Sequence, residues 1–144
     1  MPFVIDASVS LAWAFVEERN AYTRGIQMRL ETDVAYAPSI WPLEVANVLL
    51  IAERRGRITQ RDATQFAGML LVAPISVIET TPRQALNDVL SLARRSALTV
   101  YDSSYLELAL RLALPIATLD DRLRAAATAL GVPILQPISE TTDR

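Results

Sequence analysis

Residues 98–122 read LTVYDSSYLELALRLALPIATLDDR, and this stretch decides the fold. Its apolar spacing predicts a helix over 103–113, a short buried strand over 116–118 and the start of another helix directly afterwards. Asp102 therefore stands at the beginning of a helix, and Asp120 follows the carboxyl end of a strand. Ligands of open α/β sheets bind in the crevice outside the carboxyl ends of the strands. The stretch thus predicts two acids at a ligand-binding edge.

The amino-acid composition limits the chemistry that this edge can perform. The chain of 144 residues is 51% hydrophobic, enough for the core of one domain, and it has neither cysteine nor histidine. All 14 basic residues are arginine. These absences exclude disulfides, thiolate and imidazole metal sites, histidine-based catalysis and lysine-based phosphate loops. Carboxylate chemistry remains, and carboxylate oxygens are the ligands that hard cations prefer.

The net charge decides less than the local charge. The formal charge is −2, but with four carboxylates committed to a metal, 14 arginines would face 12 remaining acids. Local arginine clusters therefore matter more for nucleic-acid binding. No apolar run approaches the length of a membrane span, and the chain starts directly with the strand-like Pro2–Ile5, so we expect a soluble cytoplasmic protein.

Short apolar runs alternate with amphipathic segments along the rest of the chain. This alternation is typical of an α/β fold in which helices cover both faces of a central, mainly parallel sheet. We expect three layers, four to five short strands and a polar tail over 136–144, loose from Ser139 to Arg144. The expected strands are 3–5, 34–37, 75–78 and 132–135 in addition to 116–118, and the further helices are 9–18, 20–30, 41–55, 59–71, 83–96 and 122–130.

Asp6 and Glu44 are two further acids in notable positions. Asp6 follows the strand 3–5, and both Asp6 and Ser8 are residue types that cap helices, which is the simpler interpretation. Glu44 and Asn47 lie three residues apart on one face of a mostly apolar helix, where Glu44 also favours the helix dipole. The dipole does not explain an acid and an amide on one stripe of a helix that we expect to be largely buried, because buried charges need partners.

Asp102 and Asp120 leave similar alternatives open. Ser104 and Glu107 have the spacing of a capping box, so Asp102 is not needed to cap its helix. Of Asp120 and Asp121, one is expected to cap the final helix, and the other is then left over.

A common site for these acids would need a counter-charge. Strand ends and helix starts bring four acids to one edge of the predicted sheet: Asp6, Glu44, Asp102 and Asp120. Two carboxylates ~4 Å apart repel by roughly 4 kcal/mol at an effective dielectric constant of about 20, so the cluster is tolerable only with a cation or with protonation. Mg²⁺ or Mn²⁺, bound by oxygens and several waters, is the fitting cation.

Arginines cluster at two predicted helix ends. Cations at the C-terminus of a helix favour its dipole, and this is the simpler interpretation. The alternative is a rim that contacts phosphates, because the forked donors of arginine suit that group. The clusters are Arg54, Arg55 and Arg57, with Arg61 nearby, and Arg94 with Arg95.

Four short motifs follow one another in the chain: DAS at 6–8, ExxN at 44–47, YD at 101–102 and ATLD at 117–120. In a chain of this length, their order and spacing resemble those of the PIN-domain ribonucleases, especially the VapC-type toxins of bacterial toxin–antitoxin modules. The resemblance extends from Phe3 to about Leu135.

The resemblance implies a single PIN domain over 1–144, with a PIN-like α/β/α fold, that hydrolyses RNA phosphodiester bonds with Mg²⁺ or Mn²⁺. One or two ions would be bound by the catalytic acids Asp6, Glu44, Asp102 and Asp120, supported by Ser8, Asn47 and Thr118. The RNA backbone would be held by Arg54, Arg55, Arg57, Arg94 and Arg95. The implied protein partners are a cognate antitoxin that covers the cleft and a second copy of the chain in a homodimer.

Other classes with acidic pockets fit less well. Receiver domains and haloacid-dehalogenase-like phosphatases rely on a lysine that this chain does not contain, and Asp6-Ala-Ser8 lacks the second Asp of the phosphatase motif. A catalytically silent PIN-like module that binds RNA or protein stays the alternative, although all four acids are present. The RNA target is not encoded in a readable pattern.

Overall fold

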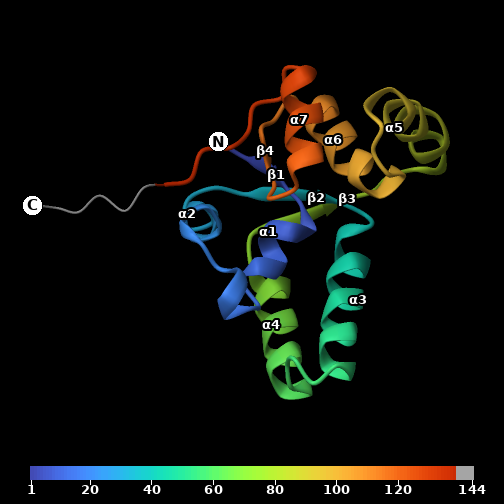
Figure 1. The fold of residues 1–144 in the computed structure, drawn as a ribbon. Helices are drawn as coiled ribbons and strands as arrows, with labels where there is room; N and C mark the ends of the chain where they lie inside the picture. Colours follow the sequence, from blue (N-terminus) through green and yellow to red (C-terminus); the bar gives the residue numbers. More distant parts are fainter. Residues whose placement is uncertain (139–144) are drawn as a thin grey trace, which may run out of the picture.

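A four-stranded sheet forms the centre of the protein in the computed structural model, which describes residues 1–138 (Figure 1). The strands stand in the order β3-β2-β1-β4, and every neighbouring pair is parallel. The parallel sheet predicted from the sequence is confirmed. Its strands are β1 (Phe3–Ile5), β2 (Ala35–Pro38), β3 (Ile75–Ile78) and β4 (Ile116–Ala117).

Helices lie on both sides of this sheet, which confirms the three predicted layers (Figure 1). One side carries α5 (Leu90–Ser96), α6 (Val100–Leu112) and α7 (Asp121–Ala129). The other side carries α1 (Ala7–Ala12), α3 (Trp41–Arg54) and α4 (Gln60–Val72), and α2 (Ala21–Arg29) packs against α1. Within residues 1–138, no helix combines the length and the apolarity that a membrane crossing needs.

The central strand β1 fixes the edge at which the acids gather. All of its residues are fully buried, as expected for a strand with neighbours on both sides and helices on both faces. Val4 pairs with Tyr36 of β2 and with Ile116 of β4. Because the strands run in the same direction, residues 6–8 and 118–120 leave the sheet at the same edge.

The first helix is shorter than predicted. α1 ends at Ala12, and the chain turns into the 3₁₀ segment η1 (Val16–Glu18). The turn is held by Trp13, whose indole N–H donates to the carbonyl of Thr23 (2.8 Å). The continuous helix predicted over 9–18 was wrong, because apolar spacing does not reveal such a tertiary hydrogen bond.

The helix that carries Asp102 begins three residues earlier than predicted. Thr99 caps α6, since its hydroxyl accepts a hydrogen bond from the backbone N–H of Asp102 (3.1 Å). The predicted capping box of Ser104 and Glu107 is therefore wrong. Both residues lie inside α6, and the Glu107 carboxylate instead pairs with Arg111 one turn further on (2.9 Å).

Three other segments differ from the prediction in detail. The helix predicted over 83–96 begins with a π-helical segment, η2 (Gln84–Val89), before α5. The strand predicted over 132–135 makes only an isolated bridge to β4, and Pro133 offers no N–H for a longer ladder. The expectation of a largely buried α3 was wrong, because the helix turns only one stripe toward the core: Trp41, Val45, Leu49 and Ala52.

The last described residues pack against α2. The guanidinium of Arg29 donates to the carbonyl of Gln136 (2.7 Å). The chain passes so close to α2 that a Cβ added at Gly25 would collide with Pro137. Residues 136–138 of the predicted tail are thus held on the protein, and Ser139–Arg144, predicted to be loose, lie outside the described residues.

Candidate active site

Asp6 is a buried carboxylate whose two oxygens are both engaged. Oδ1 accepts hydrogen bonds from the Ser8 hydroxyl (2.5 Å) and from the Val9 backbone N–H (3.3 Å), and the latter caps α1. Oδ2 accepts from the hydroxyl of Thr118 (2.5 Å). Only 5% of Asp6 is exposed, so these donors replace the water that burial removes. The capping role and a role in a site are therefore both compatible with its position.

The two hydroxyls that hold Asp6 also join the two loops at the sheet edge. Ser8 Oγ accepts a hydrogen bond from the N–H of Leu119 (3.0 Å), and Thr118 Oγ1 accepts from the N–H of Asp120 (3.0 Å). Each hydroxyl thus donates to Asp6 and accepts from the loop after β4. The arrangement fixes Asp6 and Asp120 relative to each other.

Burial changes the acidity of Asp6. Removal from water raises the pKa of this carboxyl from 3.8 to about 6, against the opposing effect of its hydrogen bonds, and the charge of Asp102 raises it further. A cation near Asp6 would favour its ionised form.

Asp120 caps α7 through Oδ1, and its other carboxylate oxygen, Oδ2, does not take part in the cap. Its Oδ1 accepts from the backbone N–H of Leu123 (2.9 Å). Asp121, the competing candidate, is exposed in the first turn of the helix. Arg124 supports the loop from behind, since its Nε donates to the Thr118 carbonyl (2.8 Å). Asp120 is thus the acid that this loop orients.

Asp102 stands in the first turn of α6 with a less occupied carboxylate. The side chain is partly buried. Burial raises the pKa of Asp102, the negative charge of Asp120 raises it further, and a side-chain hydrogen bond with Thr99 lowers it. Asp102 is therefore the acid of this set that is most available to a ligand.

Glu44 is held by a residue that the sequence did not single out. The hydroxyl of Tyr105, 61 residues away in the chain, donates to Glu44 Oε1 (2.7 Å). Burial raises the pKa of Glu44, the Tyr105 hydrogen bond lowers it, and the charge of Asp102 raises it. Burial and the neighbouring Glu44 raise the pKa of Tyr105, which therefore stays a donor. Tyr105 lies three residues after Asp102 on the same helix, and this spacing is the sequence feature that could have indicated a role for Tyr105 at the site.

The charges of neighbouring acids in this set affect one another's pKa values, but the four carboxylates do not form a compact cluster. Among residues 1–138, no group of three or more acidic side chains is close enough together to hold a metal ion as it stands. Mg²⁺ usually keeps several waters and binds through one or two carboxylates together with substrate phosphates. Burial and then the charge of a neighbouring acid raise the pKa values of Asp6, Glu44 and Asp102, and such carboxylates fit a cation.

Asn47 is not brought into this network. It is exposed on α3 and forms no hydrogen bond with any part of the chain that the structure describes. Ser8 and Thr118, the other two residues expected to support the site, both contact Asp6 directly.

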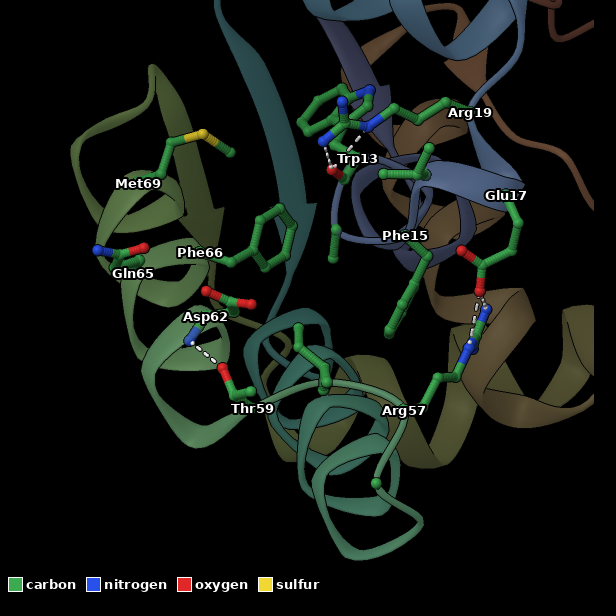
Figure 2. Close-up of a pocket in the computed structure, with 14 residues that line it drawn as sticks. Trp13, Phe15, Glu17, Arg19, Arg57, Thr59, Asp62, Gln65, Phe66 and Met69 are labelled. Atoms are coloured by element: carbon green, nitrogen blue, oxygen red, sulfur yellow. Dashed lines mark hydrogen bonds and ion pairs between the residues drawn. The ribbon is translucent and has the colours of Figure 1, made fainter.

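Arg57 is occupied by a structural contact. Its guanidinium pairs with Glu17 (2.5 Å) and Glu18 (3.1 Å) and stacks over the ring of Phe15, 3.9 Å from the ring centre. Figure 2 shows the Arg57–Glu17 pair beside a hollow of about 490 Å³. This hollow is lined by the turn after α1 and by α4, and none of the four candidate acids lines it.

The other predicted arginines are exposed and lie at different distances from the acids. Arg54 and Arg55 end α3, ten residues after Glu44, which corresponds to about 15 Å along a helix. Arg94 and Arg95 lie in the last turn of α5, shortly before the helix that carries Asp102.

Fold and site together define a class: a parallel α/β protein with acids at the carboxyl edge of its sheet. The PIN domain profile matches residues 3–129, so the chain belongs to the PIN-domain family. The chain is 30% identical over 138 residues to ribonuclease VapC3 of Pyrobaculum aerophilum, covering 92% of this chain and 100% of that protein.

Solved structures share the fold. PAE2754 from Pyrobaculum aerophilum is similar with a TM-score of 0.66 and 27% identity, over 88% of this chain and 79% of that one. VapC20 from Mycobacterium tuberculosis, described as a sarcin–ricin loop cleaving toxin, has a TM-score of 0.65 at 14% identity, over 94% and 99% of the two chains. VapBC2 from Rickettsia felis, bound to a DNA fragment from its promoter, has a TM-score of 0.60 at 10% identity, over 94% and 98%.

Proposed function

We propose that this protein is a metal-dependent endoribonuclease that acts as the toxin of a toxin–antitoxin pair. The observation that carries the proposal is the set of four acids at the carboxyl edge of the sheet, in which the pKa values of Asp6, Glu44 and Asp102 are raised by burial and by neighbouring charge. The names of VapC3, a ribonuclease, and VapC20, a cleaving toxin, support the same activity.

The proposed roles follow from how each acid is held. Asp6, Glu44, Asp102 and Asp120 would hold one or two Mg²⁺ or Mn²⁺ ions. Such an ion, when bound, lowers the pKa of a coordinated water and neutralises charge on the attacked phosphate. Ser8 and Thr118 fix the Asp6 carboxylate, and Tyr105 fixes Glu44. Asn47 would act on bound water rather than on a carboxylate, since it contacts none of the acids.

The proposed macromolecular partners are RNA, a cognate antitoxin and a second copy of the chain in a cytoplasmic homodimer. The VapBC2 structure, a complex by name, supports the antitoxin. The exposed arginines would contact the RNA backbone: Arg54, Arg55, Arg94 and Arg95, with Arg57 contributing the part of its guanidinium left by Glu17 and Glu18.

The test is cleavage of structured and single-stranded RNA by the purified protein, first after chelation with EDTA and then with MgCl₂ or MnCl₂ restored. We expect no cleavage in EDTA and cleavage when either cation returns. Cleavage that persists in EDTA contradicts the metal dependence, and RNA that stays intact under all conditions contradicts the nuclease and favours a silent binding module.

A further inference from the structure

A shallow hollow of about 600 Å³ lies between the end of α5 and one face of α7. We call it the Arg95–Arg122 hollow. Its floor is built mainly from alanines spaced along one face of α7, with Leu130 at the end of that helix. It is lined by Arg95, Ser96, Ala97, Arg122, Ala125, Ala126, Ala129 and Leu130.

The two arginines of this hollow carry uncompensated charge. Within residues 1–138, neither Arg95 nor Arg122 takes part in an ion pair, and no acid lines the hollow. The hollow beside Arg57 differs, because Glu17 and Asp62 line it together with its arginines. Arg124, which lines a third hollow, is engaged by the Thr118 carbonyl. The Arg95–Arg122 hollow is thus the one of these three whose cations are open to an anion.

Both walls of the hollow are close along the chain to a candidate acid, although no acid lines the hollow itself. Arg122 follows Asp120, the cap of α7, by two residues. On the other wall, Ala97 ends α5, and the chain continues through Thr99 to Asp102. A strand of nucleic acid that leaves the acids along α7 would therefore pass over this hollow.

We propose that the Arg95–Arg122 hollow binds a backbone phosphate of the substrate RNA next to the nucleotide being cleaved, with the adjoining sugar and base against the alanine floor. The inference rests on the proposed nuclease function and assigns Arg122 a role that the sequence did not indicate. Two forked guanidinium groups from two helices suit a phosphate diester, and the small floor residues leave room for a planar base.

The experiment measures binding of a short fluorescein-labelled single-stranded RNA by anisotropy, in the Asp102→Asn background so that the RNA stays intact. R95Q/R122Q is compared with R24Q/R83Q, which removes two exposed arginines that belong to neither candidate cluster, one in α2 and one directly before η2. For R95Q/R122Q we expect affinity to fall about tenfold, as for the loss of two exposed charge contacts. The slope of log K against log salt should become shallower by about 1.4, while R24Q/R83Q changes little.

Three results would overturn the inference. Equal losses in both double variants would assign the effect to general charge rather than to this hollow. If R95Q/R122Q binds RNA as its parent does, the arginines serve another partner, such as a protein. If the wild-type chain neither cuts nor binds RNA, the proposed function fails together with this inference. If wild type cuts RNA and R95Q/R122Q binds RNA as tightly as its parent, only the inference about the hollow fails. Thermal unfolding of both double variants at the parent temperature confirms that they fold.

Discussion

Asp6 and Asp102 are both acids at the start of a helix, yet they differ in burial and in the hydrogen bonds that their carboxylates accept. Asp6 is buried, caps α1 and has both oxygens bound by Ser8 and Thr118. Asp102 is partly exposed and leaves the capping of α6 to Thr99, so its carboxylate is not committed to the helix start. Asp6 therefore stabilises the fold as well as belonging to the candidate site, whereas the carboxylate of Asp102 is available to a ligand. Substitutions should therefore separate the two.

The largest expected effect is on catalysis by Asp102→Asn. Loss of a carboxylate proposed to hold the metal ion should lower the RNA cleavage rate by about a thousandfold. Stability should stay the same or rise, because the repulsion between Asp102 and Asp120 disappears. Cleavage rates and urea unfolding measure both effects. Asp121→Asn, a neighbouring exposed acid, is the control and should cleave like wild type. A destabilised Asp102→Asn protein would contradict the comparison.

The next effect is the pH dependence of stability due to Asp6. Its pKa rises from 3.8 in the unfolded chain to about 6 in the folded protein, so the folded state binds more protons between these values. Stability attributable to Asp6 is therefore present at low pH and falls as pH rises from about 4 to about 6, by about 3 kcal/mol. Urea unfolding of wild type and Asp6→Asn across this range measures it. If the free energy of unfolding changes with pH in the same way in wild type and in Asp6→Asn, the pKa of Asp6 is not raised.

A smaller effect is expected at the contact between Tyr105 and Glu44. Tyr105→Phe removes the donor to a partly buried carboxylate and should cost about 1.5 kcal/mol of stability. It should also lower kcat more than it raises KM, since Glu44 loses its orientation. Tyr101→Phe is the matched control, because Tyr101 lies one turn earlier on α6 and is exposed. Equal behaviour of the two variants would show that the hydroxyl of Tyr105 has no special role.

The smallest effect concerns the two hydroxyls that hold Asp6. Ser8→Ala and Thr118→Val should each cost about 1 kcal/mol in urea unfolding. The double variant should cost less than the sum of the two, because both hydroxyls bind the same carboxylate and join the same loops. Thr128→Val, on the exposed face of α7, serves as the control. Strict additivity would indicate that the two contacts are independent.

Local sequence patterns predicted the parts of the fold that depend on local chemistry. The strands at 3–5 and 75–78 and the end of α6 before β4 follow from apolar runs and proline. The positions of Asp6 and Asp120 at the sheet edge follow from the parallel order of β1 and β4.

Contacts between distant parts of the chain could not be predicted in this way. Thr99 rather than Ser104 caps α6, and two Ser/Thr residues five positions apart both satisfy the pattern, so packing decides between them. The hydroxyl of Tyr105 binds Glu44, 61 residues away in the chain, and no local sequence pattern indicates this contact. Arg57 also looked available in the sequence, but the fold brings Glu17 and Phe15 against it.

The most direct test of the account is the thermal unfolding of wild type, Asp102→Asn and Asp121→Asn during titration with MnCl₂. A ligand that binds only the folded state raises the unfolding temperature in proportion to the logarithm of its concentration above Kd. We predict such a rise for wild type and Asp121→Asn, and a much smaller one for Asp102→Asn. The same shift in all three proteins, or no shift in wild type, would contradict the claim that these acids form a cation-binding site.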